Sequence, residues 1–377
     1  MRKKISVAIV YNEPVTDAET KRKFISEHGV LQEGSGIARE QAETMVDLSE
    51  VGVLEEREDI ARALNAIGYK ASIFNVDEDI CRLVNFLKDE QPDIIFNLCE
   101  SVGNIATHEM HVAGIYELMG IPYTGSDAFT LGIALNKVLV KEVLSCNGLP
   151  TPRSQFFKSP VKIALDESMA YPLIVKPSHE DASIGIEPSS IVTNMNELRK
   201  RVRYIIEEYD QPALVEEYID GRELNVAIMG NRKPIIFPIS EIDMSTLPKR
   251  YPRIITYNAK WMKGTEEYEH TKGVCPALLP PALETQLKEM ALSAYRLLGC
   301  RDYARIDFRL SKDHQTYILE VNPNPDISDD AGFARSATAY GYTFEELAGK
   351  IVECALERMP GLQFARYSRV TVSDYMR

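Results

Sequence analysis

Two carboxylates and an amide lie close together in the stretch YARIDFRLSKDHQTYILEVNPNPDIS. Side chains alternate between the two faces of a β-strand, so Arg305 and Asp307 share one face of a first predicted strand. By the same alternation, Ile318, Glu320 and Asn322 share one face of a second strand. The polar link SKDHQT is short, so we expect an antiparallel hairpin in which Asp307, Glu320 and Asn322 converge.

This set of donors suits a divalent cation. Two carboxylates and an amide are hard oxygen ligands, and Mg²⁺ (or Mn²⁺) takes one or two carboxylates together with water and phosphate oxygens. Arg305 beside them would repel a metal but would bind a phosphate or a developing oxyanion. The alternative is a solvent-exposed amphipathic hairpin without a chemical role. We favour the metal site, because the apolar VNPNP continuation indicates burial and a buried unpaired carboxylate is unfavourable.

The composition limits the classes of protein that could carry such a site. The 377 residues include 43 basic and 56 acidic side chains, and the net charge of −13 argues against nucleic acid or a membrane surface as a partner. The length predicts two or three domains. Six scattered cysteines without a CxxC pair, no secretory signal and no span long enough to cross a bilayer predict a cytoplasmic protein.

The elements that would position the hairpin begin with a parallel α/β pattern. KISVAIVY, KASIFNV and DIIFNLCE are predicted strands, and EEREDIARALNAIGY and DEDICRLVNFLKDEQP are predicted helices between them. A polar stretch at residues 12–50 interrupts this alternation, and we interpret it as a long insertion near the substrate side.

The middle of the chain changes character. LGIALNKVLVKEVLSC is predicted as one helix, and a Gly/Pro break at residues 148–152 follows it. Beyond the break, PLIVKPS, SSIVTN, PALVEEYI, ELNVAIMGN and KPIIFPIS are predicted strands around a single helix, NMNELRKRVRYIIEEYD. A helix with proline in its first turn, LPPALETQLKEMALSAYRLLGC, then precedes the hairpin. This is an α+β pattern.

Five stretches in this order resemble the ATP-grasp ligases, and within them the D-alanine–D-alanine ligase family. They are IPYTGSDAFTLGIALNKVLVKEVL, YPLIVKPSHEDASIGI, ALVEEYIDGRELNVAIMG, YNAKW with CPALLP, and the hairpin itself. The resemblance covers roughly residues 90–350. It implies that Lys137, Lys176 and Lys260 contact phosphates, although each alone would pass for a surface lysine.

The resemblance also implies a nucleotide site with defined contacts. The small residues of DASIGI, including Ser183, would let backbone N–H groups approach the phosphates. Glu216 would accept a hydrogen bond from the adenine amino group, and Glu217 and Ile219 would offer backbone groups. Glu223 would take the ribose hydroxyls. Without the resemblance, this segment would equally fit an exposed acidic turn.

The implied fold has three parts, with ATP held between the last two. Residues 1–125 would form an N-terminal parallel α/β domain, 126–225 a small α+β lid, and 226–377 a C-terminal α+β domain with the metal site. The implied reaction joins a carboxylate, such as that of an amino acid, to an amine through an acyl phosphate, with Arg305 stabilising the oxyanion and Lys260 acting at the phosphoryl group. The family also implies a homodimer formed through the first domain.

The part of the chain expected to hold the amino acids departs from the family pattern. Ala182 stands where a serine is expected, and Trp261 stands where a tyrosine would join that serine. Asp326 replaces a glycine, and Asp330 and Ala331 replace a His-Ser pair that would meet the second substrate's carboxylate.

These departures lead to a substrate hypothesis. An acid such as Asp326 or Asp330 in the acceptor pocket would repel a carboxylate, so we expect an acceptor with a basic group or without a free carboxylate rather than D-alanine. Glu100 ends the third predicted strand, where doubly wound sheets place ligands, and is either a substrate contact or a structural cap. The resemblance implies that Glu13 aligns with an acid that contacts the first substrate's amine, which makes it a further candidate substrate contact.

Two other functions fit part of this pattern. One is a nucleotide-binding regulatory protein without ligase chemistry, which the altered amino-acid half would allow. The other is an ATP-grasp kinase that phosphorylates without ligating. The complete set of Arg305, the three lysines and the three oxygen donors favours the ligase. The dependence of ADP release on acid alone, or on acid plus amine, separates the three functions.

Overall fold

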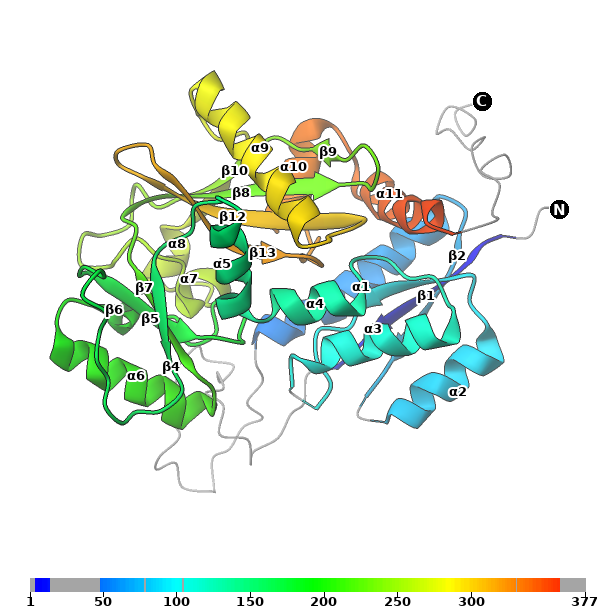
Figure 1. The fold of residues 1–377 in the computed structure, drawn as a ribbon. Coiled ribbons are helices and arrows are strands. Elements are labelled where there is room, and N and C mark those ends of the chain that lie inside the picture. Colours follow the sequence, from blue (N-terminus) through cyan, green and yellow to red (C-terminus); the bar gives the residue numbers. More distant parts are fainter. Residues whose placement is uncertain (1–3, 14–47, 78, 104, 330, 360–377) are drawn as a thin grey trace.

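The computed structural model of the chain describes residues 4–13, 48–77, 79–103, 105–329 and 331–359, with the backbone alone for 48–51. Most of the stretch predicted as an insertion, and the candidate Asp330, therefore lie outside the described residues. Figure 1 shows three sheets: the first at the right, the second at the lower left and the third above them. Among the described helices, none is both long and apolar enough to cross a bilayer.

The first sheet is parallel, with strand order β2-β1-β3, which confirms the prediction. Its bounds are β1 Ser6–Tyr11, β2 Lys70–Asn75 and β3 Ile94–Leu98, with helices α1 Leu48–Ala66, α2 Ile80–Glu90 and α3 His108–Met119. All five residues of β3 are buried, as expected for a strand covered on both faces. Helix α1 begins before the predicted EEREDIARALNAIGY segment, inside the stretch that was predicted to be an insertion.

The segment predicted as one helix before the Gly/Pro break is two helices, α4 Ala128–Ala134 and α5 Lys137–Cys146. Asn136 separates them, because its side chain accepts a hydrogen bond from the Leu139 amide as an N-cap. This correction matters for the site, since it moves Lys137 from mid-helix to the first turn of α5.

The second sheet is antiparallel, with strand order β4-β7-β5-β6, and helix α6 packs on one face. Val175, Val202 and Val215 lie in the buried core between them. The bounds are β4 Ser154–Phe157, β5 Leu173–Pro177, β6 Ile191–Val192, β7 Ala213–Glu217 and α6 Met195–Tyr209, with a 3-10 turn η1 at Pro188–Ser190.

The third sheet has strand order β11-β10-β8-β12-β13, with β9 paired to β8. The predicted strand KPIIFPIS is broken into β9 and β10, and Pro238 lies between them, because proline cannot donate to a sheet ladder. The strand bounds are β8 Gly221–Met229, β9 Ile235–Ile236, β10 Ser240–Asp243, β11 Lys272–Val274, β12 Tyr303–Ser311 and β13 Thr316–Asn322.

Helices cover both faces of the third sheet. α9 packs on the face that carries Ala304, Ile306 and Phe308, while α10 and α11 lie between the opposite face and the first sheet, so that Val7 and Phe333 share one core. The bounds of the remaining helices are α7 Tyr257–Trp261, α8 Glu266–Glu269, α9 Pro281–Leu297, α10 Gly332–Tyr340 and α11 Phe344–Glu357.

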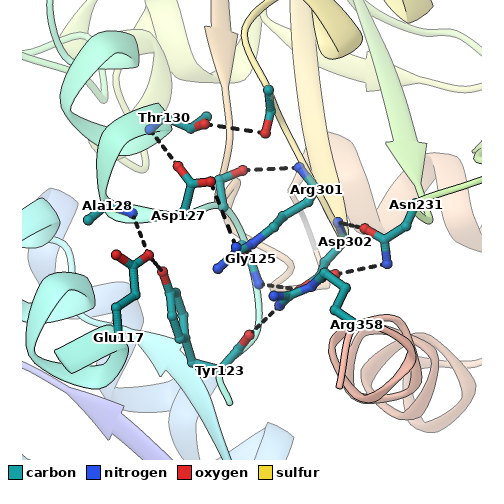
Figure 2. Close-up of polar contacts among 12 residues, drawn as sticks. Glu117, Tyr123, Gly125, Asp127, Ala128, Thr130, Asn231, Arg301, Asp302 and Arg358 are labelled. Atoms are coloured by element: carbon teal, nitrogen blue, oxygen red, sulfur yellow. Dashed lines mark hydrogen bonds and ion pairs between the residues drawn. The ribbon is translucent and has the colours of Figure 1, made fainter. Parts of the chain in front are cut away.

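An ion pair with a buried carboxylate joins the first and third sheets (Figure 2). Asp302, which is fully buried, accepts hydrogen bonds from the Gly125 amide at 3.0 Å and from Arg358 Nη2 at 2.7 Å. Asn231 donates to the same carboxylate at 3.2 Å. The predicted fold class, parallel α/β followed by α+β, is confirmed. The three domain boundaries stay a prediction.

Candidate active site

A cleft of about 800 Å³, counting the part that opens to solvent, lies between the second and third sheets. This is within the size range of small-molecule sites. Its walls come from the start of α5, from β5 and the loop after it, from β7 and the link to β8, and from β8, β12 and β13. The predicted site residues that line it are Lys137, Lys176, Ser183, Glu216, Glu217, Ile219, Glu223, Asp307 and Glu320.

The hairpin of β12 and β13 is antiparallel, as predicted, and pairs Asp307 with Glu320 and Arg305 with Asn322. Asn322 Nδ2 lies 2.9 Å from Asp307 Oδ2 and 3.3 Å from Glu320 Oε1. The structure therefore brings the three oxygen-bearing side chains together at the floor of the cleft.

The predicted face of Ile318 is wrong. A register shift next to Asp307 pairs Phe308 with Ile318, and leaves Leu319 without a partner on β12. Ile318 consequently lies in the core with Val321, and Leu319 joins Glu320 in the cleft wall. The extra residue is a β-bulge, which re-aims side chains next to a site.

Asp307 is surrounded by donors. Arg305 binds it through two nitrogens at 2.8 Å each, and Asn225 Nδ2 donates to it at 2.6 Å. Burial raises the pKa of Asp307, and Arg305 opposes this rise. Burial also opposes ionisation of Glu320, but Lys137 and Lys176 outweigh it and lower the pKa of Glu320 to about 2.

The donor chemistry fits Mg²⁺ better than a metal that needs a complete protein cage. Within the described ranges, no group of three His, Cys, Asp or Glu side chains could enclose a metal ion. Asp307 and Glu320 offer two carboxylates with one amide beside them. Mg²⁺ completes such a partial set with water and phosphate oxygens, and the neighbouring cleft has room for a phosphate chain.

Glu216 lies between two lysines at the opposite wall of the cleft. Its carboxylate is 2.8 Å from Lys141 Nζ and 2.8 Å from Lys176 Nζ. Burial would raise the pKa of Glu216, but the two ammonium groups lower it to about 2. Its buried Oε1 atom is the one that lies 2.8 Å from Lys141 Nζ. A carboxylate oxygen has a second lone pair, with which it can also accept from a ligand N–H.

Lys141 was missed in the sequence, although a signal was present. It lies four residues after Lys137 on the same face of a helix and is 3% exposed. Burial lowers its pKa, and Glu216 opposes that change. Its ammonium also donates to Thr151 Oγ1 at 2.6 Å, so it couples α5 to the entry of the second sheet.

Lys137 projects from the first turn of α5 into the cleft and is 7% exposed. It forms a close ion pair with Asp181 and lies 3.7 Å from Glu320 Oε2. Asp181 comes from the loop after β5 and was not among the predicted site residues. In the structure, a protein carboxylate therefore contacts the lysine that was predicted to contact a phosphate.

The loop after β5 has unusual backbone geometry. Ala182 and Ser183 have φ values of +54° and +62°, a left-handed conformation that is unfavourable for residues with a Cβ. Trp261 Nε1 donates to the Ala182 carbonyl oxygen at 2.9 Å, and the Tyr257 amide donates to Ile186 at 3.0 Å. Helix α7 thus holds the backbone of the loop. The resemblance to the family had implied a contact between a serine and a tyrosine side chain at positions 182 and 261.

Lys260 and Arg305 lie outside the residues that line the cleft. The Lys260 ammonium is 4.7 Å from the Trp261 ring centroid. Although Lys260 is exposed to solvent, desolvation of its ammonium and the neighbouring Arg305 lower its pKa, while Asp326 raises it. Asp326 therefore lies within electrostatic range of both predicted catalytic cations. It also caps the turn that follows, accepting from the Ser328 amide at 2.7 Å.

Glu13 and Glu100 are not brought into the cleft. Both lie at the carboxyl edge of the first sheet, where Asn12 accepts from the Glu100 amide at 2.9 Å. Glu13 accepts from the Tyr11 hydroxyl at 2.8 Å and from Arg57 at 3.4 Å.

Glu56, a buried acid of α1, was also missed. It is 7% exposed and accepts from the Ile327 amide at 3.1 Å, directly after Asp326. Burial raises its pKa well above the ordinary value, and Asp326 adds to the rise. No local pattern marks this contact, because it joins residues 271 positions apart.

Comparisons with known proteins agree with this architecture. The family model described as D-ala D-ala ligase C-terminus matches residues 145–353. A D-alanine–D-alanine ligase from Carboxydothermus hydrogenoformans is 32% identical over 311 residues, which cover 79% of this chain and 91% of that protein. The uncharacterized protein y4sG from Sinorhizobium fredii is 30% identical over 307 residues, covering 80% of this chain and 88% of that protein.

A solved structure extends the likeness to the whole fold. The crystal structure of D-alanine–D-alanine ligase from Bacillus anthracis complexed with ATP has a TM-score of 0.67 to this chain. The match covers 94% of this chain and 98% of that one at 21% sequence identity. At that level of identity the likeness establishes the arrangement of the elements.

Proposed function

This chain belongs to the D-alanine–D-alanine ligase family of the ATP-grasp ligases, and on that basis we propose that it is an ATP-dependent ligase that joins a carboxylate to an amine. One observation carries the proposal most directly. The carboxylates of Asp307 and Glu320 converge on the floor of a cleft that Lys137 and Lys176 also line. A triphosphate is bound by positively charged side chains together with a metal ion that neutralises its charge, so it requires lysines and metal ligands in the same place.

The adenine end of the site is assigned to the wall that holds Glu216. Its buried Oε1 would accept from the amino group of adenine, while backbone groups of Glu217 and Ile219 would bind the ring edge. Glu223 would accept from the ribose hydroxyls. These residues all line the same cleft, which supports one continuous nucleotide site.

The phosphate end is assigned to the residues around the hairpin. Asp307, Glu320 and Asn322 would hold Mg²⁺, or Mn²⁺, which when bound supplies positive charge to the transferring phosphoryl group. Lys137, Lys176 and the backbone around Ser183 would hold the phosphate oxygens. Trp261 would keep the loop closed over them.

In the reaction we propose, the donor carboxylate attacks the terminal phosphorus of ATP, which forms an acyl phosphate and releases ADP. The amine then attacks the acyl carbon and phosphate leaves. Lys260 would stabilise the transferring phosphoryl group, and Arg305 would stabilise the oxyanion formed at the acyl carbon. No protein nucleophile is needed, so the donor remains bound to phosphate rather than to the enzyme.

The acceptor is proposed to differ from D-alanine. Asp326 lies within electrostatic range of Arg305 and Lys260, in the half of the site where the reacting amine must approach. A carboxylate at this position repels an acceptor carboxylate and favours a cationic group. We therefore propose an amino acid or amine acceptor that carries a basic group or lacks a free carboxylate.

The test is phosphate release by the purified protein with ATP and Mg²⁺, screened over pairs of carboxylic acids and amines. Release that requires both an acid and an amine supports the ligase. Release with an acid alone supports an ATP-grasp kinase, and nucleotide binding without release supports a regulatory protein. Efficient use of D-alanine as acceptor would contradict the proposed acceptor class but not the ligase. A homodimer formed through the first domain remains a prediction, which sedimentation would test.

A further inference from the structure

Arg309 is a buried cation in the cleft wall to which the proposed mechanism gives no task. It lies on β12, on the same face as Asp307, is 4% exposed and lines the cleft. A charged side chain that is this deeply buried must be compensated by its neighbours. Its partners therefore indicate what it does.

The guanidinium of Arg309 is compensated by one carboxylate and two backbone carbonyls. Its Nη1 atom lies 3.6 Å from Glu223 Oε2 and donates to the Gly221 carbonyl oxygen at 3.4 Å. Its Nη2 atom donates to the Arg253 carbonyl oxygen. The strand register places Arg309 directly opposite Glu223, so the two charges are neighbours because β12 pairs with β8.

These contacts join three segments of the cleft wall. Gly221 begins β8 after the link that carries Tyr218, and the Tyr218 hydroxyl donates to the Arg253 carbonyl oxygen at 3.3 Å. Arg253 in turn precedes Ile254 and Ile255, which line the cleft. Arg309 thus fixes the position of Glu223 and of the apolar wall next to it with a single side chain.

The charge of Glu223 depends on this arrangement. Burial raises the pKa of Glu223, and Arg309 is the strongest influence in the opposite direction. An ionised carboxylate offers only acceptors, whereas a protonated one presents a donor to the ligand. Arg309 lies 3.6 Å from Oε2, and Glu223 lines the cleft, so its carboxylate can still accept from the hydroxyl groups of a ligand bound there.

We propose that Arg309 is a specificity-determining residue for the nucleotide: it holds Glu223 as an oriented acceptor and thereby selects a ribose with its 2′-hydroxyl over a deoxyribose. The inference rests on the proposed function, because it assumes that a nucleotide occupies the cleft. It goes beyond that function by naming a positioning residue and the sugar that it selects. Arg309 itself acts through Glu223 and does not contact the reacting atoms.

The experiment measures binding of ATP and of 2′-deoxyATP, each with Mg²⁺, by titration calorimetry. We expect the wild-type protein to bind ATP at least about tenfold more tightly than 2′-deoxyATP, since a buried acceptor left unpaired by a missing hydroxyl weakens binding by about that factor. R309M should lose most of this preference, with a ratio below about threefold. R309K, which keeps the charge but not the planar fork, should lie between the two.

The matched control is R222M. Arg222 is the residue before Glu223 on β8 and pairs with Glu241 at 2.5 Å on the other side of the strand, so its loss should leave the preference for ATP unchanged. Circular dichroism and thermal unfolding establish that each variant is folded.

Two results would overturn the inference. R309M could be folded and retain the wild-type preference for ATP, or the wild-type protein could bind both nucleotides equally. Either result would leave the ligase proposal standing, since that proposal is judged by phosphate release with acid and amine. Conversely, the wild-type protein could prefer ATP to 2′-deoxyATP, with this preference lost in R309M, and yet release no phosphate with any acid and amine. That result would remove the ligase proposal and leave the role of Arg309 intact.

Discussion

The indole nitrogen of Trp261 donates a hydrogen bond to the backbone carbonyl of Ala182 at 2.9 Å. This contact joins helix α7 to a loop whose residues 182 and 183 have left-handed backbone conformations. A side chain that holds a main-chain atom does not depend on the neighbouring side chain. The alanine at position 182 and the tryptophan at position 261 are therefore explained together.

Replacing Trp261 with phenylalanine should weaken nucleotide binding while preserving the fold. W261F keeps an aromatic ring near Lys260 but removes the N–H donor. The loss of one hydrogen bond of about 1 kcal/mol predicts a roughly fivefold rise in KM for ATP. Steady-state kinetics measure it. An unchanged KM in a folded W261F variant would show that the hydrogen bond does not hold the loop in its binding conformation.

Removing the Asp181 carboxylate should improve nucleotide binding. Asp181 forms an ion pair with Lys137, where it would compete with the phosphates that we propose this lysine binds. D181N keeps the shape and removes the charge, so we expect KM for ATP to fall about two- to fivefold, the range for a partly exposed ion pair. E180Q is the control, because Glu180 accepts from Gln211 at 2.9 Å rather than pairing with Lys137. A higher KM in D181N would mean that Asp181 helps to bind the nucleotide.

Loss of the Glu216 carboxylate should make stability less sensitive to acid. The pKa of Glu216 is lowered from 4.5 to about 2 by Lys141 and Lys176 against the effect of burial. The ionised Glu216 carboxylate therefore contributes fully to the free energy of unfolding above pH 4.5. This contribution, up to about 3 kcal/mol, is lost as pH falls towards 2. In urea unfolding, E216Q should be less stable than wild type at pH 7 and should lose less stability between pH 4.5 and pH 2. Parallel curves for wild type and E216Q would contradict this account.

Replacing Glu56 should have the opposite dependence on pH. Burial raises its pKa well above 4.5, so the folded state binds the proton more tightly than the unfolded state. The stability of the wild-type protein must then decline as pH rises from 4.5 towards the folded pKa. E56Q retains an acceptor for the Ile327 amide but has no carboxyl group to ionise, so its stability should not decline in this way as pH rises. Its free energy of unfolding relative to wild type should therefore increase from pH 5 to pH 8, and a constant difference would refute the assignment.

Local patterns in the sequence were sufficient to predict the strands of the first sheet and the antiparallel hairpin. They could not predict the bulge at Leu319, because a strand with one extra residue keeps the same composition and only the partner strand defines its register. The break before Lys137 was predictable in principle, since Asn136 is a favourable N-cap residue. However, helix-forming residues lie on both sides of Asn136, so the sequence pattern also fitted one continuous helix.

The site was predictable where residue type determines the chemistry, and less so where folding brings distant residues together. Lysines and acids in the order of a known family marked Lys176 and Glu320. Asp181 was not predicted, because the loop that contains it was interpreted as a phosphate-binding loop from its small residues. Glu56 could not be found from local sequence at all, since its partner lies at Ile327, on the other side of the interface between the first and third sheets.

Calorimetry of ATP binding with and without Mg²⁺, by wild type and by E320Q, examines whether Glu320 and Asp307 hold the cation that we propose accompanies the nucleotide. Glu320 is the better choice, because Arg305 already engages Asp307. We expect Mg²⁺ to strengthen ATP binding to wild type at least about tenfold, and we expect E320Q to lose this gain while it retains Mg²⁺-independent binding. An E320Q variant with the full effect of Mg²⁺ would contradict it.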